Sequence, residues 1–356
     1  MYDVIIVGVK FEAFGGVEKV AVELCQELCK RGYRAKILVS TSIKEKWKID
    51  SINRFFLYSS EGNDNAPFYI KEINKLRKGP RKLLVIGFWN IPNILISLCS
   101  IIWNINVITV EHSDYFYCSL KWRCLRWFAY RFSDSIVALN SFDAKKYRKI
   151  NENTLIIPNP APTFNNLKKQ VTENVILFVG HLRYLKRVDI LIDGVCLIKD
   201  KLEKERWKIL IIGEGELKES LVNKVELLGL SNLIKFVGFQ SEVSVYYSQA
   251  SILVLPSDTE CLPMTIIESK AYGIIPIVAR YSEAVKDLVQ DDVTGYTFDK
   301  GSVEGFAYML EKTISLDSSS LADIKNNIKL DSKRFNREAI FERWLTVIKG
   351  IMEKND

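Results

Sequence analysis

Short apolar runs rich in β-branched residues alternate along the whole chain with segments of helical periodicity. Within each run the hydrophobicity is continuous, which is typical of strands buried on both faces. Such strands occur in parallel sheets covered by helices, so the pattern predicts an α/β fold with two doubly wound sheets. The predicted strands are residues 4–9, 35–39, 83–87, 107–110, 136–139 and 155–157 in the first half, and 175–179, 209–212, 234–237, 252–255, 276–279 and 296–298 in the second.

A proline-rich stretch separates the two series of strands. Pro158, Pro160 and Pro162 forbid a regular helix there and stiffen the connection. We expect residues 1–160 to form one Rossmann-like domain, residues 161–336 a second, and residues 337–356 a helix that packs across to the first. Ligands of such folds bind at the carboxyl ends of the strands, which for two facing sheets means a central cleft.

The composition excludes several classes of protein. With 48% hydrophobic and 26% charged residues in 356, the chain is an ordinary globular protein, not a disordered or fibrous one. Seven scattered cysteines without a C-x-x-C pair argue against secretion and against a structural zinc site. The most apolar stretch, residues 94–103, is about half as long as a bilayer span. We therefore expect a cytoplasmic protein with no signal peptide and no membrane-crossing segment.

The net charge of +7 is unevenly distributed along the chain. Residues 1–170 carry 26 basic and 15 acidic side chains, whereas residues 171–356 carry 24 and 28. A basic first half predicts an anionic partner on that side of the protein. No nucleic-acid-binding module is recognisable, so nucleic acid is not expected as the partner.

A glycine pair follows the first predicted strand and opens a helix. Gly15 and Gly16 allow a ligand to approach the backbone closely, and the free N–H groups of a helix start favour an anion such as a phosphate. A plain strand-to-helix turn would show the same pair, so both interpretations stay open. The spacing matches neither the G-x-G-x-x-G fingerprint nor a Walker loop, which argues against nicotinamide and ATP sites of those types.

Two glutamates flank the start of a later predicted helix. Glu260 lies in the loop after an apolar strand, and Glu268 lies in the second turn of the helix that follows. The N–H groups of such a helix start can bind a diphosphate, while each carboxylate can accept hydrogen bonds from sugar or ribose hydroxyls. Two solvated glutamates on a surface loop are the plainer interpretation of the pair taken alone.

Several short motifs occur in a fixed order along nearly the whole chain. Glu260-x7-Glu268 is followed by Ala271-x-Gly273 and by a strand that opens with Pro276. The other motifs are Gly15-Gly16, Glu111-His112-Ser113, Ile157-Pro158-Asn159, Gly180-His181-Leu182 with Lys186, Ile212-Gly213-Glu214-Gly215 and Tyr246-Tyr247-Ser248-Gln249-Ala250. In this order they resemble glycosyltransferase family 4, a retaining, nucleotide-sugar-dependent family with the GT-B fold of two Rossmann-like domains. The E-x7-E pattern alone is weak, whereas the ordered set is specific.

The resemblance implies a role for each matching position. Glu268 would hold the ribose of the nucleotide, Glu260 would meet the donor sugar, and Lys186 would neutralise the diphosphate. His112 would lie near the reaction centre against donor or acceptor hydroxyls, so His112, Glu260 and Lys186 are the catalytic candidates. The further donor-binding candidates are Gly15, Gly16, His181, Arg183, Gly213, Cys261, Leu262, Pro263 and Met264.

Two positions depart from the family. His181 stands where the family usually has arginine, so either one diphosphate cation is missing or Arg183 takes its place. Cys261 stands where the family often has glycine, which changes how closely the backbone can approach the sugar. His112 and His181 are the only histidines of the chain, and both follow apolar strands directly, which weakens a purely structural interpretation of each.

The expected mechanism needs no cofactor. The chain contains no D-x-D pair, so nothing in the sequence calls for a bridging metal ion. Lys186 and the N–H groups of the helix start would stabilise the negative charge that develops on the departing diphosphate. The resemblance implies retention of the anomeric configuration by front-face attack without a protein nucleophile.

The segment 121–132 combines arginines with aromatic residues. Helical spacing predicts that Arg123, Arg126, Trp127 and Tyr130 share an outward face. This composition is typical of a helix that lies on an anionic lipid surface, although a solvated helix with partly packed aromatic residues shows it too. The predicted core face consists of Cys124, Leu125, Phe128, Ala129 and Phe132.

The resemblance to family 4, together with the basic first half and the segment 121–132, implies a retaining glycosyltransferase of surface polysaccharide assembly, such as that of O-antigen or capsule. It would move a hexose or N-acetylhexosamine from a UDP-sugar to a polyprenyl-diphosphate-linked saccharide, on the inner face of the bacterial cytoplasmic membrane. The candidates for acceptor and membrane contacts are Glu111, Ser113, Arg123, Arg126 and Trp127. Two alternatives stay open: a UDP-N-acetylglucosamine 2-epimerase-like enzyme of the same fold, and a non-catalytic sugar-nucleotide-binding scaffold subunit.

Overall fold

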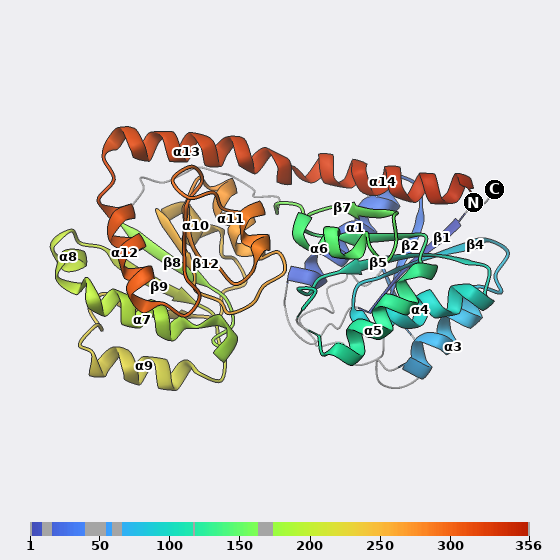
Figure 1. The fold of residues 1–356 in the computed structure, drawn as a ribbon, viewed down its shortest axis with the longest axis horizontal. Coiled ribbons are helices and arrows are strands. Elements are labelled where there is room, and N and C mark those ends of the chain that lie inside the picture. Colours follow the sequence, from blue (N-terminus) through green and yellow to red (C-terminus); the bar gives the residue numbers. More distant parts are fainter. Residues whose placement is uncertain are drawn as a thin grey trace. The chain divides into compact units, whose positions relative to one another are not determined.

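The computed structural model describes residues 2–8, 16–39, 55–58, 66–116, 118–162 and 174–354. The chain divides into two compact units, residues 1–160 with 338–356 and residues 161–337. Each unit is built around one sheet, and all neighbouring strands in the described residues run parallel (Figure 1). The predicted α/β class with two doubly wound sheets is confirmed.

The first unit contains a seven-stranded sheet in the order β3-β2-β1-β4-β5-β6-β7. The order reverses between β1 and β4, and at such a point the carboxyl ends of the strands form a ligand site. The strands are β1 (Tyr2–Val7), β2 (Arg34–Val39), β3 (Phe56–Tyr58), β4 (Lys82–Gly87), β5 (Ile105–Glu111), β6 (Ser135–Ala138) and β7 (Thr154–Ile156). The helices are α1 (Gly16–Lys30), α3 (Ala66–Leu76), α4 (Asn90–Ile102), α5 (Leu120–Ala129), the 3₁₀ helix η2 (Tyr130–Phe132), α6 (Ser141–Tyr147) and α14 (Arg337–Lys354).

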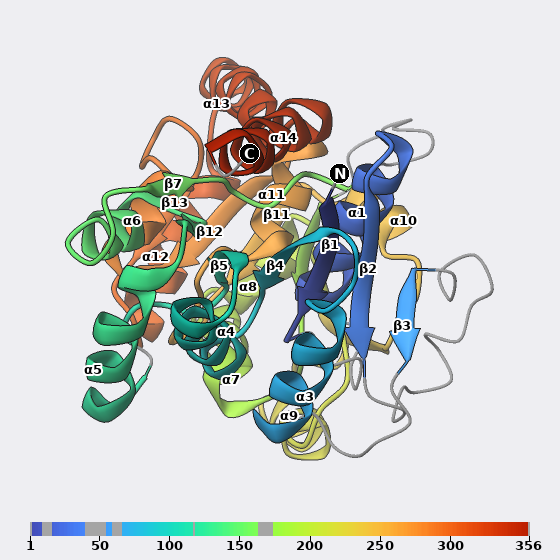
Figure 2. The same ribbon diagram turned by 90° about the vertical axis from the view of Figure 1, so that its right-hand side faces the viewer.

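Helices cover both faces of this sheet. α3 and α4 pack on one face, where Ile73 and Ile96 meet Val85 of β4 in a buried apolar cluster. α14 lies on the other face, as Figures 1 and 2 show. Its Glu342 forms an ion pair with Arg31, which follows α1. Burial on both faces explains why the central strands are continuously apolar in sequence.

The second unit contains a six-stranded sheet in the order β10-β9-β8-β11-β12-β13. Here the order reverses between β8 and β11, so the loops after these strands meet at one edge. The strands are β8 (Val175–Val179), β9 (Lys208–Ile212), β10 (Ile234–Gly238), β11 (Ile252–Leu255), β12 (Ile275–Ala279) and β13 (Tyr296–Phe298). The helices are η3 (Tyr184–Lys186), α7 (Val188–Leu197), α8 (Lys199–Lys204), α9 (Lys218–Leu227), α10 (Ser244–Gln249), α11 (Met264–Ala271), η4 (Glu283–Asp287), α12 (Val303–Ile314), α13 (Ser318–Ser332) and η5 (Lys333–Phe335).

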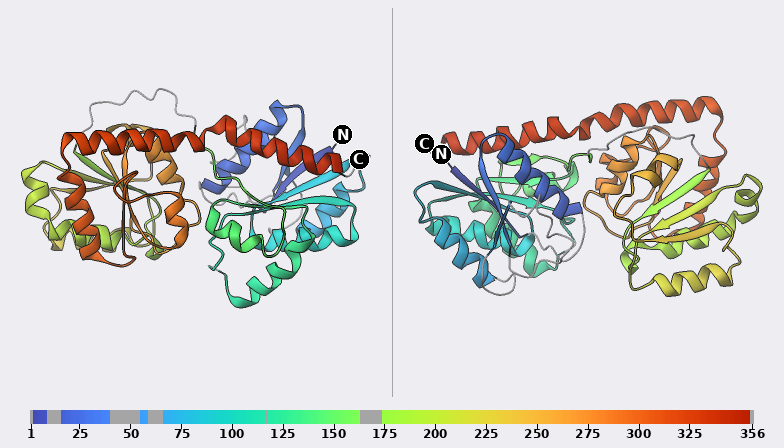
Figure 3. Two further views of the ribbon diagram at one scale, coloured as in Figure 1. Left: turned by 45° about the horizontal axis from the view of Figure 1, so that its top comes forward. Right: turned by 180° about the vertical axis from the view of Figure 1, so that it is seen from behind.

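Two layers of helices enclose the second sheet (Figure 3). On one face Ile190 of α7 and Phe306 of α12 join the main apolar cluster of this unit. On the other face, an ion pair of 2.5 Å between the buried Lys270 Nζ and Oδ2 of the partly exposed Asp331 joins α11 to α13. The Lys270 ammonium also donates to the carbonyl of Leu288, so the buried lysine has two hydrogen-bond acceptors.

Each of the twelve predicted apolar runs coincides with a strand, although Val9 lies outside the described residues. The sequence did not predict β3. This strand has three residues and lies at the edge of the first sheet, and so short a segment shows no recognisable pattern. In the described part of the chain, no helix combines the length and the apolar character that crossing a membrane requires.

Candidate active site

The loop between β11 and α11 brings the first two candidates together. Lys186, the last residue of η3, donates a hydrogen bond from Nζ to Oε1 of Glu260. The hydroxyl of Ser257 donates to the same oxygen at 2.9 Å. The backbone N–H of Asp258 donates to the carbonyl of Leu185 at 2.9 Å, which ties this loop to the one after β8. A cation and a carboxylate, both partly exposed, therefore lie at the carboxyl edge of the second sheet.

α11 begins without a side-chain cap. Its N-cap residue is Pro263, no side chain accepts a hydrogen bond from the first turn, and that turn carries no acidic residue. Thr265 Oγ1 in the same turn is buried and has no hydrogen-bond partner among the described residues. The free N–H groups of a helix start carry partial positive charge, so this turn can bind an anionic group. Cys261 and Leu262, just before it, are buried, while Met264 is partly exposed.

Glu268 is fixed by a partner from a neighbouring helix. The hydroxyl of Tyr247 in α10 donates to Glu268 Oε2 at 2.6 Å, and Glu268 is only 9% exposed. Burial raises the pKa of Tyr247 well above its ordinary value, so the hydroxyl stays protonated and remains the donor. Tyr247 also stacks on Tyr272 at a ring distance of 5.6 Å. The sequence marked Tyr247 as part of a motif but did not predict that it positions Glu268.

Arg187 is a site residue that the sequence analysis missed. It follows Lys186 and adopts a left-handed backbone conformation with φ of 49°. Its guanidinium pairs with Asp189 at 3.0 Å and with Asp258, in the loop before Glu260, at 3.4 Å. The hydrogen bond to Asp189 raises the pKa of Arg187 above its ordinary value. No sequence pattern links positions 187 and 258, because the parallel pairing of β8 with β11 brings them together.

The loops after β8 and β9 pack closely on each other. Gly213 has φ of +143°, and a Cβ at this position would lie 1.8 Å from the carbonyl oxygen of Gly180. Glycine is therefore required here to let the loop that carries His181 approach. His181 and Arg183 are both exposed, and Arg183 Nε lies 4.0 Å from a carboxylate oxygen of Glu216. That Arg183 takes the place of the family's arginine stays a prediction.

His112 follows β5 in the first unit. Its ring stacks on Phe88 at 4.9 Å with an interplanar angle of 20°. Nε2 is buried and has no hydrogen-bond partner in the described part of the chain. Burial lowers the pKa of His112 from 6.5 to about 3, so the imidazole is neutral at physiological pH. A neutral ring with a free nitrogen can exchange a hydrogen bond with a sugar hydroxyl.

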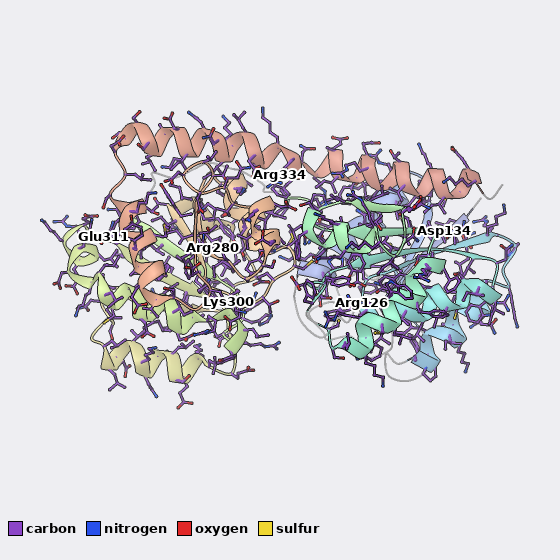
Figure 4. The ribbon with its side chains drawn as sticks, viewed as in Figure 1. Arg126, Asp134, Arg280, Lys300, Glu311 and Arg334 are labelled. Atoms are coloured by element: carbon purple, nitrogen blue, oxygen red, sulfur yellow. The ribbon has the colours of Figure 1, made fainter. Side chains whose placement is uncertain are left out.

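Glu111 and Arg126 correct the sequence analysis, which placed both on the acceptor or membrane side. Both are almost fully buried. Glu111 accepts hydrogen bonds from Tyr130 and Asn93, and its Oε2 lies 3.4 Å from Nη1 of Arg126. Arg126, which is labelled in Figure 4, also donates to the hydroxyl of Tyr147 at 2.7 Å. These buried contacts join α5 to the end of β5, so neither side chain can face a ligand or a membrane.

The predicted faces of α5 and η2 are therefore partly wrong. Arg126 and Tyr130 are buried, whereas Cys124, Phe128 and Phe132 are exposed. The reason is Glu111, whose buried carboxylate draws the guanidinium of Arg126 and the hydroxyl of Tyr130 inward. The helix then turns part of its apolar side outward. Trp127 is exposed as predicted, and Arg123 is partly buried.

The remaining candidates of the first unit are Gly15, Gly16 and Ser113. Gly15 lies outside the described residues. Gly16 is the first residue of α1 and is partly exposed, and Ser113 is partly buried in the loop after β5. Among the residues that the structure describes, no three His, Cys, Asp or Glu side chains gather in a group that could hold a metal ion.

Two family models match the chain in succession. The model described as Glycosyltransferase Family 4 matches residues 14–163, and the model described as Glycosyl transferases group 1 matches residues 161–331. Between them they include all the candidate residues and every strand of the two sheets except β1. The protein is thus a glycosyltransferase with the GT-B fold. Within that class it is an enzyme of the family 4 type.

Relatives and solved structures match along nearly the whole chain. A Campylobacter jejuni protein named as an alpha-1,4-N-acetyl-D-galactosaminyltransferase acting on a diNAcBac-PP-undecaprenol-linked saccharide is 28% identical over 346 residues, 94% of this chain and 95% of that protein. The amylovoran biosynthesis glycosyltransferase AmsD of Erwinia amylovora is 24% identical over 366 residues, 98% of this chain and all of that protein. The structure of Anabaena HepE with UDP covers 98% of this chain and 100% of its own at 17% identity, with a TM-score of 0.80. At that identity it supports the fold alone.

Proposed function

We propose that the protein is a retaining glycosyltransferase that moves a hexose or N-acetylhexosamine from a UDP-sugar to a polyprenyl-diphosphate-linked saccharide. The product would be a bacterial surface polysaccharide such as O-antigen or capsule. The name of the C. jejuni relative, with its undecaprenyl-linked acceptor, and that of the E. amylovora relative support this class of reaction. The observation that carries the proposal is the uncapped start of α11, flanked by the Lys186–Glu260 pair and followed by Glu268.

The donor would be held by the second unit. The free N–H groups of α11 and the Lys186 ammonium supply positive charge for the diphosphate, and the buried Thr265 hydroxyl supplies an unused hydrogen-bonding group. Glu268, held by Tyr247, accepts hydrogen bonds from the ribose hydroxyls. Glu260 is aligned by Ser257 and Lys186 and meets the sugar hydroxyls.

In the proposed reaction, the bond between the anomeric carbon and the diphosphate oxygen breaks, and its electron pair leaves with UDP. The acceptor hydroxyl oxygen bonds to the same face of the anomeric carbon, and its proton passes to the departing diphosphate oxygen. Configuration is retained without a protein nucleophile. Lys186 and the α11 N–H groups stabilise the charge where it develops. His112, neutral at physiological pH, contributes a hydrogen bond through Nε2 and no charge.

The first unit offers a surface for peripheral attachment to a membrane. Trp127 and Phe128 of α5 are about half exposed. Ser100 of α4 donates to the carbonyl of Phe132 at 2.9 Å, which brings the end of α4 against η2. The Arg131 guanidinium lies 3.4 Å above the Trp127 ring. Aromatic side chains beside a cation are suited to an anionic lipid surface. We call the exposed residues Ile101, Ile102, Trp127, Phe128 and Phe132 the α4–α5 surface.

Flotation with anionic vesicles tests this attachment. Replacing Trp127 and Phe128 with serine should lower vesicle binding about tenfold or more, because two exposed aromatic side chains no longer insert. The matched control is Leu227→Ser with Tyr308→Ser, which removes two exposed apolar side chains from the second unit. Equal binding by both variants and by the unaltered protein would contradict attachment through the α4–α5 surface.

The transfer reaction is tested by incubating the protein with a panel of UDP- and GDP-sugars, with and without a polyprenyl-diphosphate-linked saccharide. We expect UDP release that depends on the lipid acceptor, and Lys186→Met should lower kcat about 100-fold, as loss of one transition-state donor does. Donor turnover without any acceptor would instead indicate an epimerase. Nucleotide-sugar binding without turnover would indicate a scaffold subunit.

A further inference from the structure

Beside the α4–α5 surface, an exposed phenylalanine lies between two cations. Phe116, in the loop after β5, is 50% exposed. The Arg123 guanidinium lies 5.4 Å from the centre of its ring, and the Lys146 ammonium of α6 lies 5.5 Å from it. Phe142, on α6, completes the group with a ring distance of 6.3 Å to Phe116. We call these four residues the Phe116 cluster.

The two cations have no carboxylate partner. Among the described residues, neither Arg123 nor Lys146 forms an ion pair, and Arg123 Nε is buried without a hydrogen-bond partner. The nearby acids are engaged elsewhere. Asp114 accepts the backbone N–H of Phe116 at 2.8 Å, and Asp143 accepts that of Tyr115 at 3.1 Å. Uncompensated cations beside an exposed ring favour an anionic ligand.

Three hydrogen bonds hold Tyr115 and Cys118, which lie before and after Phe116 in the chain. Tyr115 donates its N–H to Asp143, and its carbonyl accepts a hydrogen bond of 2.7 Å from the buried Arg126. Asn90 at the start of α4 donates to Cys118 Sγ at 3.3 Å. The buried Arg126 therefore holds the backbone of Tyr115, next to Phe116, whose ring is half exposed to solvent. A site built in this way needs little reordering when a ligand binds.

The cluster continues directly into the α4–α5 surface. Arg123 and Trp127 are four residues apart on α5 and share one face of the helix. Phe128 and Phe132 lie beyond them, with a ring distance of 5.6 Å. The cations Arg123 and Lys146 thus lie at one end of this face, and the exposed apolar side chains, with Arg131 over Trp127, lie at the other. A ligand that fits both has an anionic head joined to an apolar chain.

We propose that the Phe116 cluster binds the diphosphate of the polyprenyl-linked acceptor. Arg123 and Lys146 bind the phosphate oxygens, and Phe116 contacts the first prenyl unit of a chain that runs toward Trp127. This inference rests on the proposed function, because it assigns a place to the acceptor of that reaction. His112 follows the same strand, β5, and lies four residues before Phe116.

Binding of farnesyl diphosphate and of inorganic pyrophosphate, measured by titration calorimetry, tests the inference. Arg123→Gln with Lys146→Gln should weaken farnesyl diphosphate binding about tenfold or more, because two charge-assisted contacts are lost. The matched control is Lys145→Gln with Lys149→Gln, which removes the same charge from exposed positions near or on α6. Phe116→Ala should weaken farnesyl diphosphate and leave pyrophosphate unchanged, since the ring contacts only the chain.

Equal weakening by the paired variant and its control would overturn the inference, because it would show diffuse attraction only. So would a paired variant that loses binding to anionic vesicles without prenyl diphosphate yet keeps its affinity for farnesyl diphosphate, because the cluster would then bind lipid headgroups. Transfer to the polyprenyl-linked acceptor with an unchanged KM in the paired variant would contradict this site alone. Absence of transfer from every nucleotide sugar by the unaltered protein would contradict the proposed function instead.

Discussion

At the residue scale, buried partners decide what the site side chains can do. Tyr247 donates to Glu268 at 2.6 Å, and both are shielded from solvent. One carboxylate oxygen of Glu268 is therefore held by the protein, and its direction is set by α10. His112 shows the opposite case, since its buried Nε2 has no partner among the described residues. The bond from Tyr247 orients Glu268 before any ligand binds, whereas Nε2 of His112 remains able to form a hydrogen bond.

Tyr247→Phe should weaken UDP binding. Glu268 then loses a buried donor, and its orientation toward the ribose is no longer fixed, which corresponds to about 1 kcal/mol or roughly fivefold in affinity. Glu268→Ala should weaken binding further, because the ribose hydroxyls lose their acceptor. Titration calorimetry measures both, and the neighbouring Tyr246→Phe is the matched control. An unchanged affinity in a folded Tyr247→Phe protein would show that Glu268 does not depend on this bond.

His112 should make stability depend on pH. Its pKa is lowered by burial from 6.5 to about 3, so between these values the unfolded chain binds a proton that the folded protein does not. The contribution of His112 to the free energy of unfolding has its full value above pH 6.5. It decreases as the pH falls toward 3, by up to about 1.4 kcal/mol per pH unit. Urea denaturation of the unaltered protein and of His112→Gln across this range measures the difference.

Comparing the unaltered protein with His112→Gln separates the effect of His112 on stability from that of Asp143. Burial raises the pKa of Asp143 from 3.8 to about 6, so its effect has the opposite sign between these values: protonation favours the folded state as the pH falls. Because both proteins contain Asp143, its contribution cancels in their difference. A pH-independent difference would mean that His112 titrates normally in the folded protein.

At the scale of elements, the inward side of α5 contributes to the core of the first unit and its outward side forms part of the surface. Its inward side carries Arg126 to the buried carboxylate of Glu111. Its other side carries Trp127 and Phe128 on the α4–α5 surface. The same helix supplies Arg123 to the Phe116 cluster. A change on the inward side should therefore act on stability, and a change on the outward side on binding.

Arg126→Met should lower the free energy of unfolding by about 3–5 kcal/mol, because it leaves the carboxylate of Glu111 buried without its cation. Arg131→Gln, at an exposed position just beyond the same helix, should change it by about 0.5 kcal/mol or less. Chemical denaturation measures both. If Arg126→Met has the same free energy of unfolding as the unaltered protein, the Arg126–Glu111 pair does not stabilise the first unit.

At the scale of the whole molecule, the two units carry different parts of the proposed chemistry. Lys186, Glu260 and Glu268 all belong to residues 161–337, and His112 belongs to the other unit. The chain returns to the first unit in α14, where Arg343 donates a hydrogen bond to the carbonyl of Ile156 in β7. The charge of the sequence follows the same division, with the excess of basic residues in the first half.

Transfer should survive treatment with EDTA. The proposed charge stabilisation comes from Lys186 and the start of α11, and the chain has no D-x-D pair to hold a metal ion against the diphosphate. The measurement is UDP release before and after chelation, followed by dialysis. Activity that is lost on chelation and restored by Mg²⁺ or Mn²⁺ would reveal a metal requirement.

The sequence by itself determined the layered architecture, because strands buried on both faces must be continuously apolar. It also placed His112, Lys186 and Glu260 in the segments after strands and Glu268 in the helix that follows Glu260, at the edge where parallel sheets bind ligands. Those features depend on residues that are near one another in the chain. The three-residue edge strand β3 was too short to show any pattern.

Only the tertiary structure decided which charged side chains are buried. A helical repeat shows that Arg126 and Trp127 are neighbours on α5, but it does not show that Glu111 lies buried beneath one of them. Likewise, nothing local joins Tyr247 to Glu268, Arg187 to Asp258, or Lys146 to Phe116. Each of these pairs joins segments that follow different strands, and the energy of a buried or paired charge depends on that tertiary contact and not on the residue's own segment.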